Sequence, residues 1–227
     1  INGYLYQQWV SPIYGTTIKA SSFPQGGNLL FSEDFSNNNK GWYEDTFSEG
    51  SKSYTVQVRN GHYQIDTSAT SSYFVNSFIT LDELPSSYIV TATTEKISSE
   101  GISSSGLLFD YIDQDNFDYF LLTSEGEVLI GMRRNGLLVP VYYSSESKGN
   151  QIPSIVVDGA NELSLLVEED KQDGSTSLTF GLNGFEIYNL VLEKSKTYTS
   201  NLGVMVYTLD QRCTAEFTFD NFMVYEN

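Results

Sequence analysis

Apolar and polar residues alternate along most of the chain, and turn residues break the alternation at short intervals. A period of two places successive side chains on opposite faces of a strand, whereas helical periodicity is nearly absent. Asn-Gly pairs between apolar runs are strong signals for tight hairpins, because both residues tolerate positive φ in a type I′ turn. Such pairs stand at 60–61, 135–136 and 183–184, and Asp173-Gly174 is a further candidate.

The pattern therefore predicts one short strand after another. The expected strands are 29–35, 53–58, 62–67, 73–80, 88–97, 106–112, 117–123, 127–134, 137–143, 162–169, 175–182, 185–192, 202–208 and 214–225. Many short strands with frequent turn signals are typical of a sandwich or barrel. Residues 1–27 differ, because proline and glycine interrupt their apolar positions. We expect an N-terminal arm or linker there, and a β-sandwich over 28–227.

Turn lengths predict the pairing register of the central meander. A two-residue turn at 135–136 pairs Met132 with Val139, and a turn at 125–126 pairs Asp118 with Arg133. This register puts one mostly apolar face toward the core: Leu108, Asp110, Ile112, Phe117, Tyr119, Leu121, Val128, Ile130, Met132, Val139 and Val141. The opposite face mixes aromatic residues with the Asp118–Arg133 pair. A slip of one residue in any loop would exchange the two faces.

Composition narrows the classes of function. The 227 residues include 12 Lys and Arg against 29 Asp and Glu, for a net charge of −17. Such a charge repels phosphate backbones and anionic lipid, so we expect no nucleic-acid partner. With no apolar run of about 18 residues, we also expect no membrane insertion. Abundant Ser, Thr, Asn, Gly and Tyr favour an extracellular or cell-surface protein, and the lack of Asn-x-Ser/Thr sites favours a prokaryotic one.

The chain has few histidine and cysteine residues for catalysis or metal binding. His62 and Cys213 are the only residues of their types, which excludes Cys/His zinc sites and leaves His62 as the only histidine for a Ser-His-Asp triad. No nucleophile motif accompanies His62. We interpret it as an ordinary strand histidine, and Cys213 as a small buried apolar residue.

Motifs in a fixed order resemble the concanavalin A-like (LamG/laminarinase-like) jelly rolls of bacteria. Residues 30–35, LFSEDF, followed by Gly41-Trp42, are similar to that family's "DF…GW" opening. Residues 60–65, NGHYQI, resemble its "G-x-Y-x-I" hairpin, and residues 106–117, GLLFDYIDQDNF, its long central hairpin. Residues 219–224, FDNFMV, resemble its last strand. The resemblance covers 28–227 and implies an all-β, antiparallel two-sheet jelly-roll sandwich, a fold that hosts many activities.

The carboxylates argue against catalysis. Laminarinase-type members of this family carry Glu-x-Asp-x-x-Glu on one mid-sheet strand, and retaining chemistry needs two carboxyl groups about 5 Å apart. The nearest pattern here, Glu168-x-Asp170-x-x-Asp173, runs directly into the Asp173-Gly174 turn signal. We interpret it as a solvated hairpin end, and we expect no catalytic residues and no enzyme activity.

Sugar binding and calcium are the chemistries that the sequence favours. Sugars stack their C–H faces on aromatic rings while planar polar groups bind their hydroxyls. The predicted glycan contacts are Tyr111, Asp118, Arg133 and Tyr142 on one sheet face, with Trp42 and Tyr43 on a nearby loop. The alternative is that Trp42 anchors the core and that Asp118 and Arg133 form an ordinary cross-strand pair.

Hard oxygen ligands near both ends of the chain predict a structural calcium ion. They are Glu33 and Asp34 beside the first strand and Asp220 and Asn221 in the last, which terminal pairing would bring together. The alternative is cap and turn hydrogen bonding by these side chains.

We therefore predict a non-catalytic extracellular carbohydrate-binding or adhesion module whose partner is a glycan or cell-surface polysaccharide. One alternative is a structural subunit of a surface assembly, because the arm carries apolar residues at 4, 6, 9, 10, 13 and 14. Residues 1–27 would then either dock on their own sandwich or mediate self-association by strand addition. The second alternative is a glycoside hydrolase.

Overall fold

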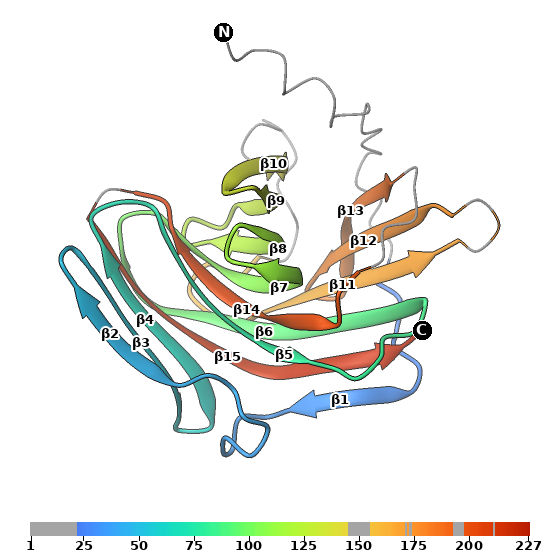
Figure 1. Ribbon diagram of the computed structural model, residues 1–227, viewed down its shortest axis with the longest axis horizontal. Coiled ribbons are helices and arrows are strands. Elements are labelled where there is room, and N and C mark those ends of the chain that lie inside the picture. The colour runs from blue at the N-terminus through green and yellow to red at the C-terminus, as the bar shows by residue number, and fades with distance from the viewer. Residues whose placement is uncertain (1–21, 145–154, 171, 173, 193–197, 211) are drawn as a thin grey trace, which may run out of the picture.

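The computed structural model describes residues 22–144, 155–170, 172, 174–192, 198–210 and 212–227. They form two antiparallel sheets that pack face to face (Figure 1). This confirms the all-β jelly-roll sandwich expected from the alternating pattern. No helix in this part of the chain is long and apolar enough to cross a membrane.

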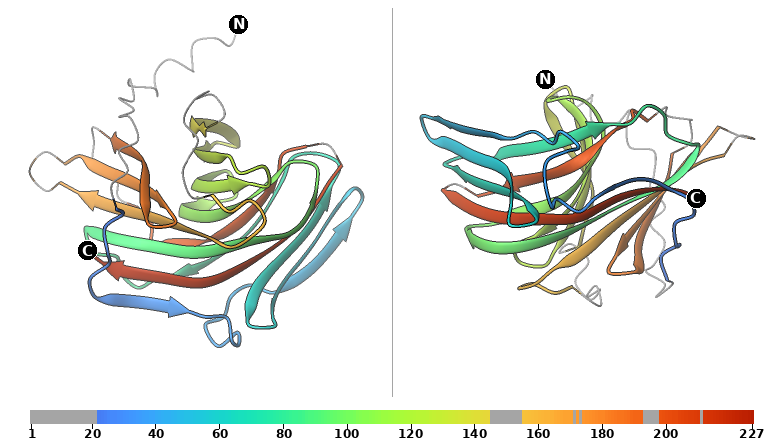
Figure 2. Two further views of the ribbon diagram at one scale, coloured as in Figure 1. Left: turned by 180° about the vertical axis from the view of Figure 1, so that it is seen from behind. Right: turned by 90° about the horizontal axis from the view of Figure 1, so that it is seen from below.

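The larger sheet has nine strands in the order β13-β12-β11-β6-β15-β4-β3-β2, with β1 paired to β15. Its strands are β1 (Leu29–Glu33), β2 (Asp45–Glu49), β3 (Lys52–Arg59), β4 (His62–Ala69), β6 (Ser87–Glu100), β11 (Asn161–Glu169), β12 (Thr176–Leu182), β13 (Phe185–Leu192) and β15 (Cys213–Glu226). Seen from behind in Figure 2, β1 runs beside β15, and β2 and β3 lie at the edge opposite β12 and β13. Of the strands, only β2 was not predicted.

The smaller sheet has six strands in the order β10-β9-β8-β7-β14-β5. Its strands are β5 (Tyr73–Thr80), β7 (Ser103–Asp113), β8 (Asn116–Thr123), β9 (Val128–Arg134), β10 (Leu137–Tyr143) and β14 (Asn201–Thr208). The Asn-Gly pairs close the β3–β4, β9–β10 and β12–β13 hairpins as predicted. Their asparagines have φ of 50–55° and their glycines φ of 78–81°, the positive values that a type I′ turn requires.

The predicted register of the meander is wrong at two connections. Between β8 and β9 the turn is one residue longer than predicted, and Thr123 N–H donates to Glu127 O at 2.8 Å. Asp118 therefore lies opposite Met132 and not opposite Arg133. Between β7 and β8 the register shifts after Phe109, beside Asp110 at φ 50°. Met132 does pair with Val139, as the two-residue turn predicts, but a shift between Pro140 and Tyr142 sets Tyr142, and not Val141, opposite Ile130.

The one-residue difference between β8 and β9 exchanges the faces of β7 and β8 relative to β9. The predicted core face is therefore wrong for part of its length. Val128 and Ile130 belong to the main core between the sheets, as predicted, together with Phe109 and Phe120. A separate cluster holds Leu108, Phe117, Tyr119 and Leu121, which the sequence assigned to that main core. Ile112, also assigned to it, is 59% exposed.

Residues 22–27 lie against this chain's own sandwich. The Phe23 ring is 4% exposed and packs with Ile89 and Leu166 on the outer face of the nine-stranded sheet. A Cβ on Gly181 would lie 2.2 Å from this ring, so glycine leaves room for it. Phe23 N–H also donates to Gly184 O at 2.8 Å. Residues 1–21 lie outside the described residues, and what was expected of them stays a prediction.

Phe23→Ala should lower the free energy of unfolding by about 3–5 kcal/mol, because it removes a buried ring and leaves a cavity. Urea denaturation measures this change. Val191→Ala, at a site that is 60% exposed, serves as the control and should have little effect. Equal stability of the wild type and Phe23→Ala would mean that the ring contributes nothing to the fold.

Candidate glycan-binding site

The outer face of the six-stranded sheet carries a continuous cluster of apolar and aromatic side chains, to which every strand of the sheet contributes. We call it the aromatic face, and its principal members are Phe74, Phe78, Leu108, Tyr111, Phe117, Tyr119, Leu121, Leu129, Arg133, Leu138, Met205 and Tyr207. It looks away from the nine-stranded sheet, because its residues alternate with those of the main core along each strand.

The local sequence explains why this face is apolar. Residues 202–207 of β14, LGVMVY, and residues 117–122 of β8, FDYFLL, are apolar at most positions on both faces. Strands of that kind need cover on both sides. On β9, a Cβ at Gly131 would lie 2.4 Å from the Tyr119 hydroxyl, so glycine lets the tyrosine ring lie across the neighbouring strand. The result is a sheet that buries side chains on both faces.

Two stacked ring pairs join the partly exposed rings of the aromatic face to one another and to the buried Tyr207. The Phe74 and Tyr207 rings lie 4.3 Å apart at 12°, and the Phe78 and Tyr111 rings lie 4.4 Å apart at 30°. The Arg133 guanidinium carbon sits 5.1 Å from the Phe74 ring centre. Such a contact is attractive because the ring face is electron-rich. These rings hold one cationic, multidentate donor on an otherwise apolar surface.

Arg133 keeps most of its hydrogen-bonding capacity. Its Nη2 lies 3.1 Å from Asp115 Oδ1, and the Asp115 side chain is 62% exposed. Arginine has five N–H donors in a fixed planar arrangement. Among the described residues Arg133 uses one of them, and its Nε is buried without a partner, which leaves the other Nη donors. The group is therefore positioned by a ring and a carboxylate, yet it can still bind oxygen atoms of a ligand.

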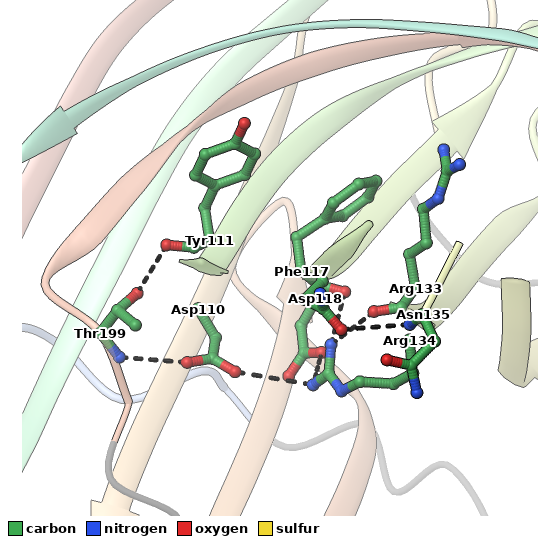
Figure 3. A network of polar contacts seen from close by, with 9 residues as sticks. Asp110, Tyr111, Phe117, Asp118, Arg133, Arg134, Asn135 and Thr199 are labelled. Atoms are coloured by element: carbon green, nitrogen blue, oxygen red, sulfur yellow. Dashed lines mark hydrogen bonds and ion pairs between the residues drawn. The ribbon is translucent and has the colours of Figure 1, made fainter. Parts of the chain in front are cut away.

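The next residue, Arg134, points to the other side of the sheet. Figure 3 shows Tyr111, Phe117 and Arg133 directed one way and Asp110, Asp118 and Arg134 the other. Arg134 forms ion pairs with Asp118 and with Asp110, the latter at 3.5 Å between Nη2 and Oδ2. It also donates to Phe117 O at 2.9 Å.

These polar groups lie at the margin of the main core. Asp110 and Asp118 are 1% and 4% exposed. Burial, with added repulsion from these two carboxylates, raises the pKa of the Tyr88 hydroxyl, so this phenol stays neutral. Thr199 N–H donates to Asp110 Oδ1, and Thr199 Oγ1 donates to Tyr111 O, both at 3.1 Å. The buried network thus fixes the backbone from which Tyr111 reaches the aromatic face.

The structure separates the predicted glycan contacts. Tyr111 and Arg133 lie together on the aromatic face. Asp118 lies on the opposite side with Arg134, so the expected Asp118–Arg133 pair is wrong. Tyr142 stacks on Tyr188 at 4.7 Å and packs against the main core.

The other two predicted contacts lie in the connection between β1 and β2. Trp42 is 2% exposed and packs with Phe35 and Phe222 at 5.1 Å, so it is the core anchor of the alternative interpretation. Tyr43 is 49% exposed beside the β2–β3 hairpin.

Sequence reasoning missed Phe74, Phe78 and Tyr207. Each lies on a strand whose apolar residues occupy both faces, which was the available signal. What the sequence did not show was that β14 pairs with β7, and β5 with β14, in one sheet.

The predicted calcium ligands do not converge. Pairing of β1 with β15 sets Glu33 opposite Phe222, as expected of terminal strands. However, Asp34 Oδ1 accepts Ser36 N–H at 3.0 Å, and Asp220 Oδ1 accepts Asn221 N–H at 2.7 Å. No group of three or more His, Cys, Asp and Glu among the described residues is arranged to hold a metal ion.

Of the four predicted calcium ligands, Glu33 keeps one feature of a metal ligand. It is 6% exposed, its Oε1 accepts Phe35 N–H at 2.9 Å, and its buried Oε2 has no hydrogen-bond partner among the described residues. Calcium at this position stays a prediction.

The remaining candidates lie away from the aromatic face. Glu168 and Asp170 stand at the end of β11 in the other sheet, while Asp173 is outside the described residues. His62 Nδ1 lies 3.8 Å from Asp220 Oδ2, and Cys213 is buried. A groove of about 340 Å³ lies over β2, β3, β4 and β15, lined mostly by Ser and Thr with Asp66 and Glu216.

Comparisons with known proteins support the fold. No protein-family model matches the chain, and no curated protein sequence matches it. The laminarinase catalytic domain from Thermotoga petrophila RKU-1 superposes with a TM-score of 0.53 at 11% identity, covering 88% of this chain and 98% of that one.

Two further structures agree. One was reported for endo-acting O-glycanases that prominent members of the human gut microbiota express. It superposes with a TM-score of 0.53 at 12% identity, covering 88% of this chain and 99% of that one. The GH43 protein BlXynB from Bacillus licheniformis superposes with a TM-score of 0.53 at 12% identity over 86% of this chain. The match spans only 39% of that protein. At such identities the likeness shows the fold, in keeping with the concanavalin A-like resemblance.

Arg134→Ala should destabilise the protein by about 3–5 kcal/mol, because it strips a cation from buried carboxylates. Arg133→Ala removes the same charge but only a cation–π contact and an exposed ion pair, so about 1–2 kcal/mol is expected. Urea denaturation of the two neighbours makes a matched comparison. Equal losses would show that Arg134 does not hold the sheet together.

If calcium binds at Glu33, EDTA should lower the melting temperature by several degrees, because an ion bound only to the native state stabilises it. Glu33→Gln should remove this response to EDTA. Identical melting curves of the wild type with calcium and with EDTA would eliminate the calcium site.

Proposed function

We propose that this chain is a non-catalytic carbohydrate-binding module and that the aromatic face is its binding surface. The observation that carries the proposal is Arg133, held by the Phe74 ring and Asp115 with its remaining Nη donors uncommitted, on a sheet face that is mostly apolar and aromatic.

The chemistry of this face suits a sugar. Sugar rings present apolar C–H patches and a rim of hydroxyls, and sites for such ligands combine aromatic walls with a few fixed polar groups. The partly exposed rings of Phe74 and Phe78 supply apolar contact, Tyr111 adds a phenolic hydroxyl, and Arg133 adds planar donors. The stacked rings support one another, so little ordering is required when a ligand binds.

The distribution of carboxylates supports binding without hydrolysis. Hydrolysis of a glycosidic bond uses a pair of carboxyl groups that flank it. None of the residues named above as principal members of the aromatic face is Asp or Glu. Asp115 and Glu127 stand in the loops at its rim, where they contact Arg133 and the Tyr143 hydroxyl.

The partner that we propose is an extracellular or cell-surface polysaccharide. The names of the structural neighbours, a laminarinase and O-glycanases that initiate mucin breakdown, suggest the first glycans to test. A net charge of −17 favours neutral glycans over polyanionic ones, since like charges repel.

Affinity electrophoresis in gels that contain laminarin, xylan or mucin tests this function. We expect at least one polymer to retard the wild type, and Arg133→Ala to weaken that binding by about tenfold, as for a central arginine contact. Arg59→Ala is the control, because it removes the same charge from an exposed residue of the other sheet.

Two results would contradict the proposal. Equal retardation of the wild type and Arg133→Ala would place binding elsewhere, and a glycan array without any bound sugar would remove the function itself. Release of reducing sugar from any of these polymers would contradict the proposal in another way. If substitutions on the aromatic face did not abolish it, the chain would have a catalytic site elsewhere.

A further inference from the structure

A second aromatic surface lies where the two sheets end side by side. The nine-stranded sheet ends at β2, whereas the six-stranded sheet ends at β5. On the β2–β3 hairpin, Phe47 and Tyr54 have the same orientation as the buried Val56, yet both remain partly exposed. We call this surface the lateral shelf, and its members are Tyr43, Asp45, Phe47, Lys52, Tyr54 and Tyr73.

The rings of the lateral shelf form a row. Phe47 and Tyr54 stack at 5.3 Å and 18°, and Tyr54 and Tyr73 stack at 6.5 Å and 28°. The Lys52 ammonium lies 4.8 Å from the centre of the Tyr73 ring. Tyr43 stands beside this row with 49% of its surface exposed. Aromatic surface and a cation thus occur together here, as they do on the aromatic face.

Asp45 fixes the polar atoms of the shelf. Its Oδ2 accepts hydrogen bonds from the Tyr43 hydroxyl at 2.6 Å and the Tyr54 hydroxyl at 3.2 Å. These bonds raise the pKa of Tyr43 and lower that of Asp45, so the phenol stays neutral and the carboxylate charged. Tyr63, whose ring is buried, donates to Tyr43 O at 2.6 Å and holds the backbone in place.

Strand β5 joins the two surfaces. Adjacent residues of a strand point to opposite faces, and here Tyr73 faces the lateral shelf while Phe74 faces the aromatic face. Phe74 is also the ring on which Arg133 lies. Both surfaces therefore meet at one exposed edge strand.

We infer that the lateral shelf is a second sugar-binding subsite, and that the ligand is an oligosaccharide or polysaccharide chain that crosses the edge of β5 from the aromatic face to the shelf. The inference rests on the proposed function of the aromatic face. Asp45 and Lys52 would bind the hydroxyls of the sugar units beyond the edge, and Tyr43 and Phe47 their C–H faces. A single monosaccharide would reach only one surface.

Isothermal titration calorimetry with a series of oligosaccharides, from about two to about eight sugar units, tests the inference. A ligand long enough to occupy two linked subsites should bind with higher affinity than one that occupies a single subsite. The probes are laminari-oligosaccharides, xylo-oligosaccharides or released mucin O-glycans, according to which polymer retards the wild type. Wild-type affinity should rise with chain length. In Tyr43→Ala and Phe47→Ala the affinity for the longest probe should fall by about tenfold, while that for the shortest stays unchanged.

Arg133→Ala separates this inference from the proposed function, because it should weaken the binding of short and long probes alike. Phe185→Ala is the matched control, an aromatic residue 41% exposed on β13 at the opposite edge of the same sheet, and it should change nothing. If Phe47→Ala proves unstable on heating, the more exposed Tyr43→Ala decides the test.

Each outcome bears on one claim. Affinity that does not rise with chain length, or Tyr43→Ala equal to the wild type on the longest probe, overturns the lateral shelf and leaves the aromatic face intact. A wild type that binds no probe of any length overturns the proposed function, and the inference with it.

Discussion

The ion pairs of Arg134 with Asp118 and Asp110 constrain three neighbouring strands of the six-stranded sheet. They connect β9 to β8 and β7 through two buried carboxylates. A charged group there is stable only when it is paired, so a shift of one residue in the register of β9 would leave carboxylates without their cation. With Arg134 inside, alternation puts Arg133 outside, and the composition of the aromatic face follows.

Both faces of this sheet are apolar. The inner face packs against the nine-stranded sheet, and the outer face builds its own cluster around Met205 and Leu121, which are both fully buried. A surface rich in tyrosine and phenylalanine above such a cluster is rigid, because the layer beneath it is already packed. Rigid aromatic surfaces lose little entropy when they bind, and this suits a module that recognises sugars through shape.

Local signals predicted much of the fold. The Asn-Gly turns, nearly all strands and the pairing of the first strand with the last are as expected, because each depends on neighbouring residues or on a known family pattern. The register failed at the connection after Thr123 and at the bulge beside Asp110, since neither an extra turn residue nor a bulge has a distinct sequence signal here. Strand β2 was missed because DTFSE is mostly polar. The site could be predicted only in part, because Phe74 and Tyr207 meet through sheet order, which a single sequence does not give.

The central claim is that a glycan lies on the aromatic face beside Arg133. The most direct measurement is an NMR titration with an oligosaccharide of the retarding polymer, following the side-chain resonances of Arg133, Phe74 and Tyr207. The account predicts that these resonances shift together and saturate with one affinity. Saturable shifts confined to the groove around Asp66 and Glu216, with the aromatic face unchanged, would contradict it.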